Sequence, residues 1–286
     1  MSSSTAAPLL DHIVILVPHS FLTSPPDWFT GLFTIYPGGR HAGGLSENSL
    51  VLFADGSYIE FFAFVPGADP AERAAHRWGN QREGSVVDWA LTLPGSAGEG
   101  LGEVKKAFNT VQGAVNGTQT GLSYSDLTPG GRNRPDGVEL KWAISSAQQG
   151  KENIEPGLLP FWCLDDTKRE LRVPYKQDGV AKHPSGAVGV ALVSVTPPEQ
   201  ATAERLDKVY GALLGGDAFE DDSLWDLKTL EGEELHAGGQ VRLETVQNEK
   251  SVSIALFTDS KEQGGKKVGG YVDEKTRLEF ELVAAN

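Results

Sequence analysis

One pattern recurs three times along the chain: an apolar strand that ends at a proline, then a helical stretch, then further strand-like runs. The three strands occupy residues 11–18, 88–94 and 190–197. Both faces of each strand are mostly apolar, which is typical of a strand that is covered on two sides. The third helical stretch has apolar residues at i, i+3, i+4 and i+7 and stops at two glycines, as an amphipathic helix does.

A strand, a helix and several antiparallel strands, repeated, indicate an α+β architecture built from βαβββ modules. One module cannot bury both faces of its sheet, so we expect modules to pair and their curved mixed sheets to surround a pocket. We predict paired modules one and two over residues 9–166, and a third βαβββ-like module with a C-terminal extra strand over residues 186–286. The stretches 66–84 and 167–185 are expected to connect modules and to cover the pocket.

The composition narrows the class of partner. The formal net charge is −14, and no basic patch interleaved with aromatic residues occurs, so we expect no nucleic-acid partner. The single cysteine, Cys163, excludes a disulfide framework and fits a reducing compartment. No apolar run approaches the roughly 20 residues that span a bilayer. We therefore expect a cytoplasmic protein that binds a small molecule and no membrane.

Short motifs follow one another in a fixed order. They are Leu10-Asp11-His12-Ile13-Val14, Gly38-Gly39-Arg40-His41, Glu47-Asn48-Ser49-Leu50, Asp55-Gly56-Ser57-Tyr58-Ile59-Glu60, Arg134-Pro135-Asp136-Gly137, Leu159-Pro160-Phe161 and His183-Pro184-Ser185-Gly186-Ala187. From about residue 9 to about residue 258, this set resembles the glyoxalase-like domain family of the vicinal oxygen chelate superfamily. The resemblance implies βαβββ modules, a homodimer as the expected assembly and, in many relatives, a divalent metal ion held by a first-strand His and a last-strand Glu. It does not select a reaction.

His12 and Glu60 are the leading candidates for a site. His12 shares a strand face with Val14 and Leu16, and Glu60 shares one with Phe62. A carboxylate on such a face is costly unless it is paired, hydrogen-bonded or bound to metal. The resemblance puts both side chains on one inner wall, where they suit a single Zn²⁺, Mn²⁺, Fe²⁺ or Ni²⁺ ion. The alternatives are a metal-free His–Glu hydrogen bond and an arginine paired with Glu60.

A complete metal site of this kind needs ligands from a second module. Aligning the three prolines places Asp88 and Ala191 at the position of His12, and Ala191 cannot ligate a metal. The residues expected at the position of Glu60 are Phe161 or Trp162 in module two and Ile254 or Glu279 in module three. The sequence therefore predicts an incomplete set of metal ligands.

Arg40 and Asn48 are expected to contact the substrate, because they flank Gly38-Gly39, where the backbone can approach a ligand closely. Arg40 can clamp a carboxylate or polarise a carbonyl group. The alternative is that the glycines form a bend and that Asn48 binds loop backbone. For His41 we favour this structural role.

Other candidates are aromatic or basic. Trp89, Trp142 and Trp162 lie in strands of module two and are expected to line an apolar or aromatic pocket, with core packing as the alternative. His183 precedes the third repeated strand and is expected to point into the site as a general base, with a structural role in the turn as the alternative. Arg132 lies in a glycine-rich loop, where it is either solvated or reaches an anionic group.

These residues together predict a glyoxalase-like metabolic enzyme, a lyase or isomerase, that acts on a small carbonyl- or hydroxyl-bearing organic molecule. His12 and Glu60 would hold a metal ion or act directly as acid and base, and Arg40 would orient the substrate. The alternative is a non-catalytic binding or sequestration protein of the same fold. Its pocket would be the same, and the contact between His12 and Glu60 would be structural.

Overall fold

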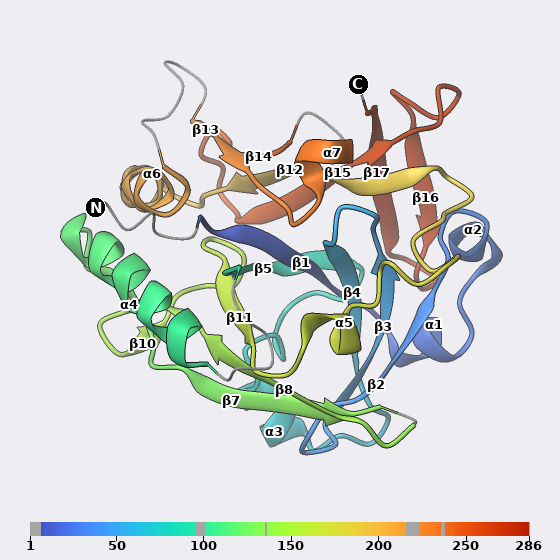
Figure 1. The fold of residues 1–286 in the computed structure, drawn as a ribbon, viewed down its shortest axis with the longest axis horizontal. Coiled ribbons are helices and arrows are strands. Elements are labelled where there is room, and N and C mark those ends of the chain that lie inside the picture. The colour runs from blue at the N-terminus through green and yellow to red at the C-terminus, as the bar shows by residue number, and fades with distance from the viewer. Residues whose placement is uncertain (1–6, 95–100, 135, 216–222, 236–237, 286) are drawn as a thin grey trace.

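The protein folds around two sheets that pack against each other through one apolar core. The computed structural model describes residues 7–94, 101–134, 136–215, 223–235 and 238–285. In Figure 1 a six-stranded sheet from the C-terminal part lies over a curved eight-stranded sheet from the N-terminal part. The predicted fold class, α+β with curved mixed sheets around a pocket, is confirmed.

The eight-stranded sheet has two halves with the same strand order and the same relative strand directions within each half. Its strands, in spatial order, are β2 (Tyr36–Arg40), β3 (Ser46–Leu52), β4 (Tyr58–Phe64), β1 (Leu9–Leu16), β5 (Ser85–Thr92), β11 (Phe161–Asp165), β8 (Glu139–Ser145) and β7 (Thr128–Asn133). Strands β1 and β5 are antiparallel, β4 runs parallel to β1, and β11 runs parallel to β5. The half formed by β1–β4 and the half formed by β5, β7, β8 and β11 are therefore related by an approximate twofold axis between β1 and β5.

The six-stranded sheet repeats this order at its centre. Its strands, in spatial order, are β13 (Leu224–Leu227), β14 (Gly239–Leu243), β12 (Ala187–Thr196), β15 (Ser251–Thr258), β17 (Arg277–Ala284) and β16 (Lys267–Tyr271). Here too the two central strands are antiparallel, and each has a parallel neighbour on its outer side. A three-stranded sheet is formed by β10 (Glu152–Asn153), β9 (Ala147–Gln149) and β6 (Leu122–Tyr124).

Two long helices lie side by side at one edge of the molecule, as Figure 1 shows. They are α4 (Gly102–Gly117) and α6 (Gln200–Leu214). The short helices are α1 (His19–Thr23), α2 (Asp27–Thr30), α3 (Pro70–Ala75), α5 (Arg169–Arg172) and α7 (Gly232–Leu235). The predicted stripe of α6 is confirmed, because Leu206, Val209, Tyr210 and Leu213 are all buried. The glycine pattern near Gly113 suggests a helix end there, but α4 continues for one more turn to Gly117.

Alternation along the central strands decides which side chains face the cavity. In β1, Ile13 and Ile15 belong to the core between the two large sheets. His12 points to the opposite face of the sheet, where Val14 joins a second apolar cluster. Both faces are covered, which explains why the strand is apolar at nearly every position.

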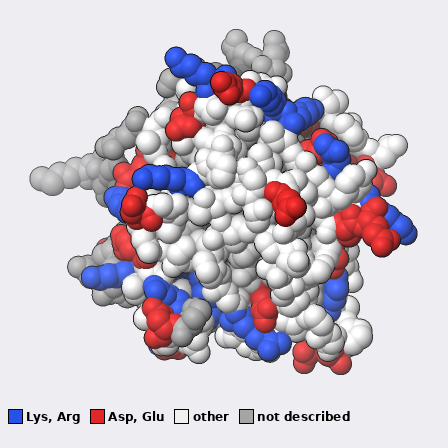
Figure 2. Space-filling model, turned by 90° about the vertical axis from the view of Figure 1, so that its right-hand side faces the viewer, with Lys and Arg blue, Asp and Glu red and all other residues white. Residues whose placement is uncertain are grey.

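The surface carries charges of both signs. On the face shown in Figure 2, acidic and basic side chains surround a largely uncharged centre, and the basic ones form no continuous cluster there. Among the described helices, none has the length and apolar character required to cross a membrane.

Candidate functional site

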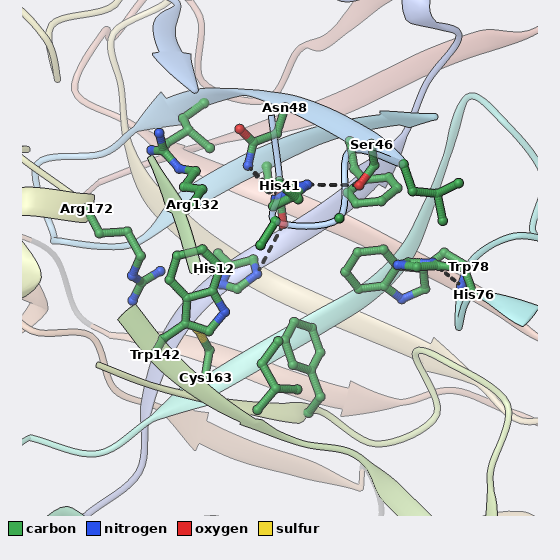
Figure 3. A pocket seen from close by; sticks show the side chains of 18 of the residues that line it. His12, His41, Ser46, Asn48, His76, Trp78, Arg132, Trp142, Cys163 and Arg172 are labelled. Atoms are coloured by element: carbon green, nitrogen blue, oxygen red, sulfur yellow. Dashed lines mark hydrogen bonds and ion pairs between the residues drawn. The ribbon is translucent and has the colours of Figure 1, made fainter. Parts of the chain in front are cut away.

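A cavity of about 460 Å³ lies against the inner face of the eight-stranded sheet. It brings together the two leading candidates, Glu60 from β4 and His12 from β1, and Figure 3 labels His12 at its wall. His12 Nε2 lies 3.5 Å from Glu60 Oε2, and both residues are buried. An imidazole and a carboxylate from separate strands therefore face each other at the cavity wall.

Behind His12 lies a buried cluster of two aspartates and two arginines, which we name the Asp–Arg cluster: Asp11, Asp165, Arg169 and Arg172. Asp11 is the extra residue of a bulge in β1, which explains why its side chain meets that of its neighbour. His12 Nδ1 contacts Asp11 Oδ1 at 2.5 Å, and both arginines donate to the Asp11 carboxylate. The cluster fixes the orientation of the imidazole and leaves Nε2 facing the cavity.

Glu60 has two further polar partners. Asn48 Nδ2 donates to Glu60 Oε1 at 2.6 Å, and His41 Nε2 lies 3.3 Å from the same oxygen. His41 is itself held by Ser46, whose Oγ lies 2.9 Å from its Nδ1, and by stacking on Phe62. The carboxylate of Glu60 is thus held by three side chains from three strands or their connections.

These contacts determine the protonation of the pair. Burial alone would lower the pKa of His12, but its hydrogen bonds to Asp11 and Glu60 outweigh burial and raise that pKa. Burial alone would raise the pKa of Glu60, but hydrogen bonds to His12 and His41 hold it well below its usual value. The two pKa shifts therefore run in opposite directions: they favour the ionised form of Glu60 and, compared with a free imidazole, the protonated form of His12.

The second half of the sheet supplies the apolar wall. Trp142, Ile144, Phe161 and Cys163 line the cavity from β8 and β11. The strand register decides between the two alternatives for module two. Ala90 is the twofold counterpart of Val14, which pairs with Glu60, and Ala90 pairs with Phe161. Phe161 therefore occupies the counterpart position of Glu60.

The counterpart of His12 is Asp88, as the prolines predict, but Asp88 is fully engaged elsewhere. Its carboxylate accepts hydrogen bonds from Arg77, from the Trp78 indole and from the backbone of Gly157. It does not line the main cavity. The second half therefore contributes no metal ligand at either counterpart position.

In the six-stranded sheet, the parallel neighbour of β12 is β14, so the expectation of Ile254 or Glu279 at the position of Glu60 is wrong. Val241 pairs with Val193 there. An apolar side chain cannot ligate a metal, so module three supplies no partner ligand.

The two connecting stretches contribute to the cavity. His76 and Trp78 lie in the stretch 66–84, and Arg172 lies in the stretch 167–185. Burial, with the nearby charge of His41, lowers the pKa of His76 to about 4, so this imidazole is neutral near pH 7.

Of the six predicted binding residues, Asn48 and Trp142 line the main cavity, whereas the other four lie outside it. Trp89 packs in the core against Tyr210. Trp162 is also fully buried in the core, because both tryptophans occupy the strand face opposite the cavity. His183 accepts from the Thr34 amide through Nδ1, and its Nε2 lies 2.9 Å from the Leu52 carbonyl oxygen, so neither ring nitrogen is available to a ligand.

Arg40 lies at an adjoining cavity of about 840 Å³. Its side chain is more than half exposed and contacts Gly44 and Glu47. It therefore does not reach the main cavity.

Sequence reasoning did not assign His41, His76 or Arg132 to the cavity. His41 directly follows Arg40 in the glycine-rich motif, so its position was a usable signal. His76 lies in a polar stretch, and Arg132 comes from β7, more than one hundred residues after β1. No local pattern in the sequence brings these two to His12.

Two imidazoles and one carboxylate meet here, and these are donor types that divalent ions take, although among the described residues their ligand atoms do not all lie within 4.8 Å of one another. His12 and His41 each have Nδ1 held, by Asp11 and Ser46, and each turns Nε2 toward Glu60. Metal-binding histidines typically have the second ring nitrogen fixed in this way, and sets of two His and one carboxylate bind Fe²⁺ and related ions with open positions.

Another group, Asp11, His12 and Cys163, places one donor atom of each residue within 4.8 Å of the others. A cation there would lie beside Arg169 and Arg172, which already bind the Asp11 carboxylate. Burial raises the pKa of the Cys163 thiol well above its usual value, so the thiol stays protonated. This group does not fit a metal ion.

Paired βαβββ halves around a polar cavity define a protein of the vicinal oxygen chelate type. A family model described as a glyoxalase-like domain matches residues 10–210. The chain therefore belongs to this family, as its sequence motifs predict. A search among curated proteins found no match.

Three solved structures are similar to this chain, and the first of them shows a likeness of fold. A hypothetical protein from Staphylococcus aureus has a TM-score of 0.65 and 14% sequence identity, over 96% of this chain and 100% of that chain. The Mn(II)-bound glyoxalase from Novosphingobium aromaticivorans has a TM-score of 0.47 and 10% identity, over 98% and 88%. A halotolerant catechol dioxygenase, BphC, has a TM-score of 0.44 and 9% identity, over 98% and 88%.

Proposed function

We propose that this protein is a metabolic enzyme of lyase or isomerase type that moves a proton on a small carbonyl- or hydroxyl-bearing molecule. The observation that carries the proposal is the approach of the His12 imidazole to within 3.5 Å of the Glu60 carboxylate at the wall of the cavity, where the pKa of Glu60 is lowered and that of His12 is raised. Oppositely poised titratable groups in a cavity mark acid–base sites.

Glu60 is the proton acceptor and His12 the proton donor. A substrate oxygen that binds His12 Nε2 replaces the contact of His12 with Glu60. The pKa of Glu60 then rises, because burial is no longer offset by that hydrogen bond, and the carboxylate becomes a stronger base. His12 donates to the developing oxyanion, while Asp11 keeps its ring oriented.

A divalent ion bound by His12, His41 and Glu60 would supply Lewis-acid stabilisation of the same oxyanion. Binding through Nε2 requires a neutral His12, so metal uptake by the protonated form of His12 would release a proton. Asn48 would keep Glu60 positioned through its hydrogen bond to Oε1.

The test is proton exchange in D₂O, followed by ¹H NMR, with a panel of 2-hydroxy ketones, 2-hydroxy aldehydes and 2-oxo acids. We expect enzyme-dependent loss of a signal for hydrogen next to the carbonyl group, abolished in Glu60→Gln and His12→Asn. Glu139→Gln, which changes an exposed carboxylate, is the matched control. Elemental analysis of the same samples measures bound metal.

The rival function is binding without turnover. The counterpart positions in the second half of the sheet favour this binding function. Phe161 has no ligand atom and Asp88 is bound to Arg77, so the second half supplies no ligand there. Stoichiometric binding of a panel compound with no exchange above the Glu60→Gln background would replace the enzyme proposal with this one.

A further inference from the structure

Arg132 is a buried cation without a carboxylate partner. Only 5% of its surface is exposed, and its Nη1 donates to the Gly38 carbonyl at 2.9 Å. Within the part of the chain that the structure describes, no Asp or Glu forms an ion pair with it. A buried charge is normally paired, because an unpaired one carries a large desolvation cost.

The free edge of this guanidinium is the edge that binds carboxylates. Nε and Nη2 have no hydrogen-bond partner among the described residues, and neither belongs to the fully enclosed polar atoms. The Nε–H and the adjacent Nη2–H point in the same direction and form a fork that matches two carboxylate oxygens. Arg132 lines both the main and the adjoining cavity, so this fork is open to a ligand.

The other buried ionisable side chains at the main cavity already have ionisable partners. Glu60 faces His12, and the two aspartates of the Asp–Arg cluster offset its two arginines. Glu72 also lines the cavity but is exposed, at its rim. Among the described residues that line this buried wall, Arg132 is therefore the cation that lacks a carboxylate partner. A single negative charge neutralises it, whereas a phosphate group would bring nearly two.

The rest of the wall fits an apolar body. Phe62, Trp78, Trp142 and Phe161 line the cavity, and Figure 3 shows Arg132, Trp78 and Trp142 among the side chains that surround it. Pockets of a few hundred Å³ with an apolar lining and few polar groups are typical of small-molecule sites.

We propose that Arg132 binds the carboxylate of an organic acid whose apolar or aromatic body lies in the main cavity. This inference rests on the proposed function in sharing its cavity, and it names the substrate class as monocarboxylic acids. Arg132 acts as a specificity residue, and the acid–base pair remains His12 and Glu60.

The test is calorimetric titration with three probes: 3-phenylpropanoate, its neutral amide and benzylphosphonate. The full chain should bind the carboxylate about 10- to 100-fold more tightly than the amide, the range expected of a charge-assisted hydrogen-bonded pair. Arg132→Gln should remove this preference and Arg132→Lys should retain part of it. Arg134→Gln, which changes an arginine paired with Asp136 on the same segment, should retain all of it.

Equal binding of carboxylate and amide by the full chain, or no binding of any carboxylate, overturns the inference. So does tighter binding of the phosphonate, or a preference that persists in Arg132→Gln and disappears in Arg40→Gln. The proposed function fails separately, because Glu60→Gln should still prefer the carboxylate while losing proton exchange. If Arg132→Gln does not fold, the preference of the full chain and the Arg132→Lys result still decide.

Discussion

The two halves of the eight-stranded sheet share one topology but present different chemistry to the same cavity. The half formed by β1–β4 contributes His12, His41, Asn48 and Glu60, while the half formed by β5, β7, β8 and β11 contributes mainly Trp142, Ile144, Phe161 and Cys163. The difference is clearest at the positions that the twofold axis relates, where Phe161 occupies the position equivalent to Glu60. Duplicated architecture therefore has not produced a duplicated site: one half holds the reactive groups and the other shapes the space.

We expect the largest effect on stability from a substitution in the Asp–Arg cluster, which supports His12 in the half formed by β1–β4. Asp11→Ala leaves the buried Arg169 and Arg172 with only one of the two carboxylates that they share, that of Asp165, and we expect a loss of about 3–5 kcal/mol in the free energy of unfolding. Urea denaturation measures it. Glu139→Ala, which removes an exposed ion pair with Lys141, should change this value by less than about 1 kcal/mol. Equal losses in the two variants would mean that the Asp–Arg cluster does not support the site.

The next effect separates chemistry from stability within the polar half. Glu60→Gln keeps the shape of the side chain but cannot accept a proton, so the rate of proton exchange should fall about 100-fold or more. The thermal unfolding midpoint should change little, because Asn48 and His41 can still contact the amide. An unchanged exchange rate would remove Glu60 from the mechanism.

The pH dependence of stability tests the contact between His183, in the stretch 167–185, and the half formed by β1–β4. Burial lowers the pKa of His183 below its usual value and outweighs the opposing hydrogen bond to the Leu52 carbonyl oxygen. Below about pH 6.5, His183 binds a proton in the unfolded chain but stays neutral in the folded protein until the pH is lower. The free energy of unfolding should therefore fall as the pH drops below that value. His183→Asn should make this fall shallower in urea titrations at several pH values. An identical slope in both proteins would contradict the assignment.

The smallest expected effect belongs to the apolar half. Phe161→Leu removes aromatic surface from the cavity wall and should weaken ligand binding a few-fold, with about 1 kcal/mol lost in stability. Binding and exchange measured on the same sample separate the two consequences. A fall in the exchange rate as large as that of Glu60→Gln would erase the distinction between the halves.

Much of the architecture follows from the sequence. The apolar strands and the stripe of α6 predict paired modules, and the resemblance to the glyoxalase-like family implies that His12 and Glu60 share one inner wall. The alternation of side chains along the strands also predicts which tryptophans face the core. If Asp88 is the counterpart of His12, then Trp89 must face the other way, into the core, and the same alternation separates Phe161 from Trp162.

Other features need the tertiary structure. His183 lies in a motif typical of the family, but only the fold shows that Thr34 and Leu52 occupy both of its ring nitrogens. Arg132 reaches the cavity because β7 closes the far edge of the sheet, which no local spacing reveals. Long-range register and the pairing of charges decide such placements, and a single sequence does not contain them explicitly.

The most direct test of the account is a crystal structure of the full chain, grown without added ligand. The account predicts that His12 Nε2 and the Glu60 carboxylate face each other inside the cavity, in direct contact or joined through one metal ion that His41 also binds. Finding the two side chains apart, or on the outer face of the sheet, would contradict it.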